Sequence, residues 1–182
     1  MSSYPVYDLD SAPAASQRAL SDLQQTFGAI PSIAGVMAGS PVLLNGFVPL
    51  FAQVHAGSFS EAQIQTLLLT NAVTNESLWP VAFHTALALQ HGVAPSDVAA
   101  MRARKLPTEP KLLALSRLAR SLIEKRGKLE EGDLHAFRQA GFAAAQVLEV
   151  IAVVGASTIT NYAASVGQPA LEPQLRPHSW NV

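Results

Sequence analysis

The sequence predicts an all-α protein with a single domain and about seven to nine helices. Apolar residues recur at helical spacing along most of the 182-residue chain, and capping residues and glycines divide it into helix-sized segments. No stretch shows the strict alternation of polar and apolar residues that is typical of a strand. A chain of this length can bury a core without the help of disulfides or metals.

Three regions are expected along the chain. Residues 1–15 carry Pro5 and Pro13 among small polar residues, which predicts an extended arm. Residues 16–167 hold all the helical patterns and form the domain. Residues 168–182 contain three prolines and predict a tail that is available to clasp a neighbouring subunit.

The first half of the domain shows clear start and stop signals. The first helix places Leu20 and Leu23 on one face and stops at Gly28. Ser40 before Pro41 is typical of an N-cap followed by proline at the first helical position. The expected helices of this half span 16–27, 30–37, 41–55 with a kink at Pro49, and 61 to the polar turn at 74–77.

The second half contains five further helices. Ser77 is expected to cap the first of them, with its hydroxyl accepting the main-chain N–H of Trp79. Glycines at 92, 127, 141 and 167 mark the ends of other segments, as expected for helix C-termini. The expected helices span 78–91, 95–104, 110–125, 130–140 and 143–166.

Composition excludes several functional classes. The chain has no cysteine, so it cannot carry a thiol nucleophile, a disulfide or a thiolate metal site of its own. The net charge is −1 and only 14% of residues are charged, which excludes the basic footprint of a nucleic-acid-binding protein. So neutral a surface also predicts a homo-oligomer that covers part of it.

No membrane association and no secretion are expected from the sequence. The uncharged run between residues 22 and 61 is interrupted by glycines and prolines, and the run from 150 to 171 contains seven polar or proline positions. The first residues lack the basic and apolar regions of a secretory signal, so a cytoplasmic location is expected.

The hairpin between residues 61 and 92 carries a family resemblance. At Gln65, Ser77, Pro80 and His84 it has the spacing Glu-x11-Cys-x2-Cys-x3-His of the AhpD-like, carboxymuconolactone decarboxylase superfamily. The resemblance extends over roughly residues 20–170 and implies the helical bundle of that family. In its peroxidase branch a thiolate reduces the peroxide, whereas here three of the four motif residues differ. A serine hydroxyl does not pass through the oxidation states of a thiol, so thiol peroxidase or peroxiredoxin activity is not expected.

Each candidate residue in the hairpin has a structural and a functional interpretation. Gln65 is either a buried amide satisfied by His84 or a substrate contact, and Trp79 is either core or pocket wall. Pro80 fits the first turn of a helix, where a missing N–H costs little. His84 is either a satisfied core histidine or a pocket residue. His91 lies seven residues further along, too far for both rings to bind one metal ion, and no metal site or cofactor is expected.

Two hypotheses of function follow. The first is a non-redox small-molecule-binding or interaction protein that has lost the thiol centre. The alternative is a cofactor-free lyase of the decarboxylase type, in which His84 is the general acid/base with a pKa near neutrality. Gln65 and Ser77 would then orient a carboxylated or lactone substrate. The expected ligand is accordingly a small organic acid or an apolar compound.

Overall fold

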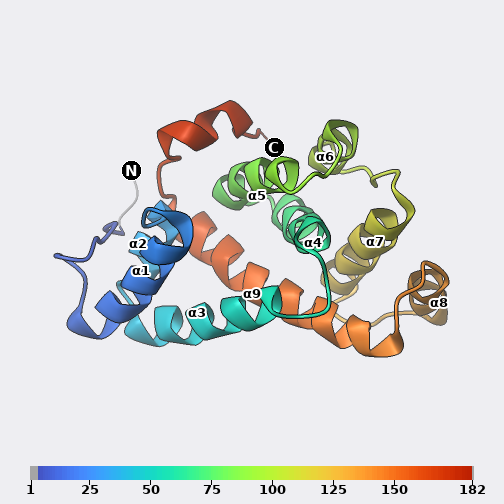
Figure 1. Cartoon of the computed structure of the whole chain (residues 1–182), viewed down its shortest axis with the longest axis horizontal. Coiled ribbons are helices and arrows are strands. Elements are labelled where there is room, and N and C mark those ends of the chain that lie inside the picture. Colours follow the sequence, from blue (N-terminus) through green and yellow to red (C-terminus); the bar gives the residue numbers. More distant parts are fainter. Residues whose placement is uncertain (1–3, 182) are drawn as a thin grey trace.

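The structure is a computed structural model that describes residues 4–181 and contains nine α-helices and one 3-10 helix in that range (Figure 1). Residues 1–3 of the predicted arm and residue 182 of the predicted tail lie outside the described range. The all-α prediction is confirmed. The elements are α1 (Ala14–Phe27), α2 (Ser32–Met37), α3 (Pro41–His55), α4 (Glu61–Thr74), α5 (Leu78–Gln90), α6 (Pro95–Arg102), α7 (Pro110–Glu124), α8 (Glu131–Gln139), α9 (Ala144–Gly167) and η1 (Pro173–His178).

Local sequence signals set most helix ends. Ser40 Oγ accepts the N–H of Leu43 at the start of α3, and Ser60 forms a reciprocal capping box with Gln63 at the start of α4. Gly28 ends α1 with a φ of 75°, a left-handed conformation in which a glycine has no Cβ to strain. The first helix begins two residues earlier than expected, because Ala14 and Ala15 extend it back to Pro13.

Helix α4 is the centre of the molecule. It packs on α5, α6, α7 and α9, and every residue from Ile64 to Val73 is buried. A helix that is buried on all sides needs apolar residues all round, which explains why α4 lacks a polar face. Helix α5 follows it after a short polar turn and packs on it, so the predicted hairpin forms the middle of the fold (Figure 1).

Polar side chains tie α4 to α9 inside the core. Asn71 Nδ2 donates to the carbonyl of Val154 at 2.9 Å, and Asn161 Nδ2 donates to Asn71 Oδ1 at 2.9 Å. Asn71 and Asn161 are fully buried. These bonds join positions more than eighty residues apart and hold the two helices in one register.

Helix α9 is the one element of the described range that is long and apolar enough to cross a membrane by length and composition. Its inner face packs on α2, α3, α4, α5 and α7, and it buries the polar residues Ser157 and Asn161 among them. Core packing therefore accounts for the apolar character of the inner face. The outer face has no partner among the described residues and is considered below.

The C-terminal segment packs on its own chain rather than extending freely. Arg102 Nη1 donates to the carbonyl of His178, Arg102 Nη2 donates to that of Ser179, and Trp180 Nε1 donates back to the Arg102 carbonyl. Helix η1 contacts α5. Over the described part, the predicted tail is therefore held against its own chain by Arg102 and Trp180.

Candidate functional site

The α4–α5 hairpin brings Gln65 and His84 into contact and places Pro80 in the wall of the same cavity as His84, whereas Ser77 contacts α9. Gln65 lies on α4, Ser77 occupies the N-cap position of α5, and Pro80 and His84 lie on the first two turns of α5. All four side chains are buried. The pairing of α4 with α5 is what sets the distance between Gln65 and His84.

A hydrogen bond joins Gln65 and His84. His84 Nδ1 lies 3.0 Å from Gln65 Oε1. His84 is only 5% exposed and Gln65 only 1%. An amide oxygen only accepts, so Nδ1 carries the ring proton and Nε2 has a free lone pair. Nε2 has no hydrogen bond to any residue that the structure describes. The sequence interpretation of a buried amide satisfied by His84 agrees with this contact.

Burial keeps the His84 ring neutral. Loss of solvent, with a smaller contribution from the nearby His55, lowers the pKa of His84 from 6.5 to about 3. The expectation of a pKa near neutrality is therefore wrong, because an imidazolium at this position would lose its hydration without gaining a carboxylate partner. At neutral pH the ring offers a hydrogen-bond acceptor at Nε2 rather than a proton.

Ser77 has a different role from the one expected. It occupies the N-cap position of α5 with extended backbone angles, but its side chain makes no capping bond. Its hydroxyl instead donates to the carbonyl of Asn161 at 3.0 Å. The expected bond to Trp79 N–H is thus absent, and the hydroxyl is directed toward α9 instead. Ser77 acts as a structural link to α9.

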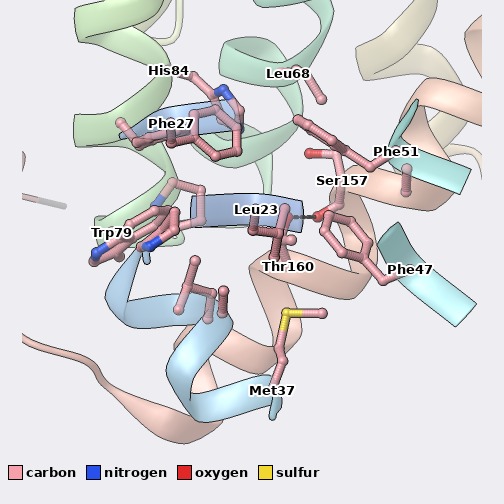
Figure 2. A pocket seen from close by; sticks show the side chains of 16 residues that line it. Leu23, Phe27, Met37, Phe47, Phe51, Leu68, Trp79, His84, Ser157 and Thr160 are labelled. Atoms are coloured by element: carbon pink, nitrogen blue, oxygen red, sulfur yellow. Dashed lines mark hydrogen bonds between the residues drawn. The ribbon is translucent and has the colours of Figure 1, made fainter. Parts of the chain in front are cut away.

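A cavity lies beside His84 (Figure 2). Its volume is about 40 Å³, or about 540 Å³ when its opening to solvent is included. Trp79 and Pro80 are in its wall, so the pocket-wall interpretation of Trp79 agrees with the structure. The lining residues are Leu23, Phe27, Pro31, Ile33, Ala34, Met37, Phe47, Phe51, Leu68, Trp79, Pro80, Phe83, His84, Ala156, Ser157 and Thr160.

Aromatic rings form one side of this cavity. The Trp79 and Phe83 rings stack at a centroid distance of 4.9 Å, and Phe27 meets Phe83 edge to face at 5.6 Å. Phe83 also meets the His84 ring edge to face at 5.3 Å. Such packing holds the imidazole in one orientation, with its polar edge framed by apolar surface.

The C-terminal segment fixes the outer wall. Glu172 Oε2 accepts the indole N–H of Trp79 at 2.9 Å, and Glu172 Oε1 accepts the main-chain N–H of Ser32 at 2.7 Å. Ser32 begins α2, and α2 supplies Ile33 and other lining residues. One carboxylate therefore joins the tail, α2 and α5 around the cavity. Glu172 has no recognisable signature in the sequence, because it lies in a proline-rich segment without a helical pattern.

Removal of this carboxylate should loosen the Trp79 wall. In a Trp180→Phe background, where Trp79 is the only tryptophan, Glu172→Ala is expected to red-shift the emission of Trp79 and to lower stability by about 1–2 kcal/mol. Fluorescence with acrylamide quenching and urea unfolding measure the two effects. The exposed neighbour Gln174 provides the control, since Gln174→Ala should leave the spectrum unchanged. An unchanged spectrum in Glu172→Ala would show that the position of Trp79 does not depend on the Glu172 carboxylate.

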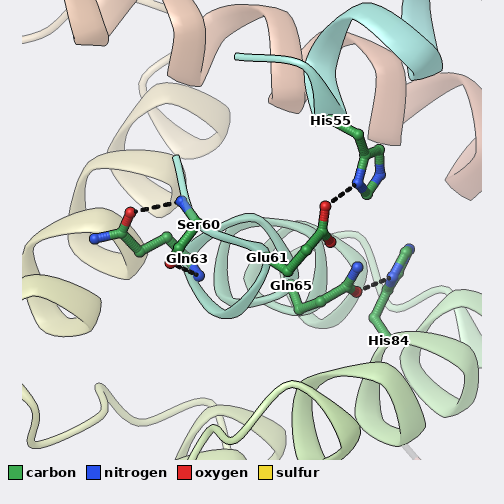
Figure 3. A network of polar contacts seen from close by, with 6 residues as sticks. All are labelled: His55, Ser60, Glu61, Gln63, Gln65 and His84. Carbon is green, nitrogen blue, oxygen red and sulfur yellow. Dashed lines mark hydrogen bonds and ion pairs between the residues drawn. The ribbon is translucent and has the colours of Figure 1, made fainter. Parts of the chain in front are cut away.

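A second cleft lies on the other side of the Gln65–His84 pair. It has a volume of about 750 Å³ and is lined by Gln65, His55 and Glu61 among other residues. His55 Nδ1 donates to Glu61 Oε1 at 2.8 Å, and Glu61 precedes Gln65 by one turn of α4 (Figure 3). Within the described residues, no group of three or more His, Cys, Asp or Glu side chains could hold a metal ion.

No family model matches the chain, and no curated protein matches it in sequence. Solved structures do match its fold. They include the alkylhydroperoxidase AhpD core of a peroxidase-related protein from Ralstonia eutropha JMP134, with a TM-score of 0.83, 18% identity and coverage of 96% of this chain and 94% of that one. A peroxidase-related protein from Silicibacter sp. TM1040 matches with a TM-score of 0.77, 19% identity and coverage of 95% and 94%.

A third similar structure is that of the debrominase Bmp8, with a TM-score of 0.77, 13% identity and coverage of 96% of this chain and 94% of that one. A cysteine-to-alanine variant of the same debrominase was solved in complex with 2,3,4-tribromopyrrole. The chain thus has the AhpD-like fold, as the hairpin spacing implied, and has it without any cysteine.

Proposed function

We propose that this chain is a non-redox binding protein for a small, flat, apolar ring compound that carries one N–H or O–H donor. The ring would lie against the aromatic wall of the cavity, and its donor would bond to Nε2 of His84. The observation that carries this proposal is the buried, neutral His84, whose ring lines an apolar cavity and whose Nε2 has no hydrogen bond to any described residue. A site of this kind is typical of ligand pockets, which combine apolar walls with a few fixed polar groups.

The character of the lining favours a neutral ligand over an organic acid. No lysine or arginine is among the residues that line the cavity, so a carboxylate would enter without a cationic partner. A neutral imidazole also cannot supply the missing charge. A donor such as a pyrrole N–H or a phenol O–H, by contrast, would satisfy the lone pair of Nε2.

One of the comparisons supports the ligand class. The debrominase variant binds 2,3,4-tribromopyrrole, which is a flat ring with a single N–H. This chain has the same fold and an acceptor at the cavity wall, so a ring with the same donor pattern is the natural first ligand to test. The chain has no cysteine, and the proposal therefore concerns binding and not turnover.

The lyase alternative requires a histidine that exchanges a proton near neutral pH. General acid/base catalysis is strongest when the pKa of the group lies near the operating pH. The low pKa of His84 favours its use as an acceptor, so binding is the function that the geometry supports best.

The proposal is tested by calorimetric titration with pyrrole and with N-methylpyrrole, which lacks the donor. Pyrrole is expected to bind about fivefold more tightly, which is the size of one net hydrogen bond. The His84→Asn variant retains an N–H at the place of Nδ1 to bond Gln65 but has no acceptor at the place of Nε2, so it should bind the two ligands equally.

His91→Asn serves as the matched control, because His91 lies at the exposed end of the same helix. It should preserve the preference for pyrrole. Equal binding of the two ligands to the wild-type protein, or no binding of either, would refute the proposed role of His84. Binding of benzoate in preference to pyrrole would favour an organic acid instead.

A further inference from the structure

The outer face of α9 is an exposed apolar stripe. Leu148 is 68% exposed, Ile151 47%, Tyr162 62% and Val166 60%, although all four belong to the helix that contacts most of the core. At 100° per residue, these side chains lie within about 40° of the direction of Gly155. From Leu148 to Val166 the stripe is about 27 Å long.

No charged group interrupts this stripe. Glu149 is the one charged residue of α9, and it points elsewhere, because its carboxylate accepts the main-chain N–H of Ser58 at 2.7 Å and the hydroxyl of the same residue at 2.9 Å. The sequence has no lysine or arginine between Arg138 and Arg176. A helix that lies on a membrane surface usually has basic residues beside its apolar face, so the charge pattern favours a protein partner.

Gly155 lies at the centre of the stripe and is exposed. A Cβ built there would meet no atom within 4 Å, so nothing in this chain requires a glycine at that position. Glycine inside an exposed helix is unfavourable compared with alanine. The close approach of a second backbone would explain its presence, since small residues allow two helices to cross at short distance.

The spacing of the stripe is the same in both directions from Gly155. Ile151 and Ile159 lie four residues to either side, and Leu148 and Tyr162 lie seven residues to either side. If a second copy of α9 is placed antiparallel over the first, with the two Gly155 residues in contact, Leu148 meets Tyr162 and Ile151 meets Ile159 of the other copy. Val166 lies beyond these pairs, opposite Ala144 at the start of the other helix. A two-fold symmetric contact requires a self-complementary surface of this kind.

The area is consistent with a dimer contact. Apolar side chains of this size have on the order of 200 Å² each, so the four exposed ones present on the order of 500 Å². A stable interface buries about 800 Å² on each partner. Partly buried residues between them, such as Thr158 and Ile159, supply further surface along the same face.

We propose that the outer face of α9 binds the same face of a second copy of this chain, antiparallel and with its two-fold axis at Gly155. The proposal does not depend on the ligand of the cavity. It is tested first by light scattering over a dilution series, where the mass should be twice the 19.2 kDa of one chain, or a higher even multiple.

Two substitutions on the stripe separate this contact from other possibilities. Ile151→Glu should leave the fold of the single chain intact, because Ile151 is exposed. In the dimer it would bury an unpaired charge in the contact, and the Kd of the dimer should rise about a hundredfold. Gly155→Leu adds apolar surface in open space, yet it should weaken the dimer about tenfold or more by forcing the backbones apart. A membrane partner would instead bind Gly155→Leu more tightly, and stronger binding of this variant to phosphatidylserine vesicles would overturn the proposal.

A control variant and a cross-linking experiment test the antiparallel arrangement of the two helices. Gly132→Ala changes another exposed helical glycine whose Cβ would meet open space, and it should leave the dimer unchanged. Because the chain has no cysteine, Leu148→Cys and Tyr162→Cys provide single thiols. A short bis-maleimide should join the two variants only when they are mixed, since in the antiparallel pair two Leu148 positions lie about 21 Å apart along the axis. Cross-linking of either variant with itself alone, or a monomeric mass for the wild-type protein, would refute this arrangement.

Discussion

Acidification from pH 7 to pH 4.5 is expected to lower the free energy of unfolding by about 2–3 kcal/mol through His84 alone. In the folded protein its pKa is about 3, whereas the unfolded chain has the ordinary value of 6.5. Between these values the unfolded state binds a proton that the native state does not bind. Stability is therefore fully present above pH 6.5 and falls by about 1.4 kcal/mol for each unit below it.

The His84→Asn variant should lose this part of the pH dependence. Urea unfolding at fixed protein concentration measures both proteins at pH 7 and pH 4.5, and the difference between their losses isolates His84 from the carboxylates that both contain. Leu68→Ala is a suitable control, because it damages the same cavity without removing a titrating group. It should be less stable at both pH values, but its loss of stability between pH 7 and pH 4.5 should equal that of the wild-type protein. If His84→Asn also lost as much stability as the wild-type protein, the His84 ring would have to be protonated in the folded wild-type protein.

The Asn71→Ala variant is expected to lose about 2–3 kcal/mol of stability. Asn71 Nδ2 donates to the carbonyl of Val154, and Asn71 Oδ1 accepts from Asn161 Nδ2, in a part of the core closed to water. Both partners keep a second contact, since Thr158 Oγ1 also donates to the Val154 carbonyl and Ser157 Oγ lies 3.4 Å from Asn161 Nδ2. The expected loss is therefore that of two buried hydrogen bonds, at about 1 kcal/mol each, together with the packing of the side chain.

Urea unfolding at neutral pH measures this loss. Asn45→Ala provides the comparison, because Asn45 Nδ2 also donates to a main-chain carbonyl, that of Ala15, but does so at an exposed position. It should cost about 1 kcal/mol or less, since water can replace the lost bond. A similar small loss in Asn71→Ala would indicate that water enters the α4–α9 contact.

Helix ends were predictable where the deciding interaction is local. Ser60 and Gln63 are three residues apart, so their capping box can be recognised in the sequence, and Gly28 ends its helix through its own backbone preference. Ser77 also has the local signature of an N-cap, but the predicted bond from Trp79 N–H to its hydroxyl does not form. The hydroxyl bonds the carbonyl of Asn161, 84 residues away, and that contact depends on how α5 packs on α9.

In the candidate site, too, local interactions were predictable from the sequence and interactions between distant segments were not. The spacing from Gln65 to His84 predicted which side chains come together, because both helices and the turn between them are contiguous in sequence. The pKa of His84 was not predictable, since it depends on burial by α1, α3 and α9, and these elements contribute Phe27, Phe51 and Ser157 to the cavity. The contact of Glu172 with Trp79 spans 93 residues and has no local signature at all.

That contact also has a consequence for the order of events during synthesis. Trp79 and Ser32 are made long before Glu172, yet both donate a hydrogen bond to its carboxylate. While α1–α8 are being made, the indole N–H of Trp79 therefore lacks this partner. Closure of the cavity wall is therefore a late step of folding, after α9 and the first residues of the tail have emerged.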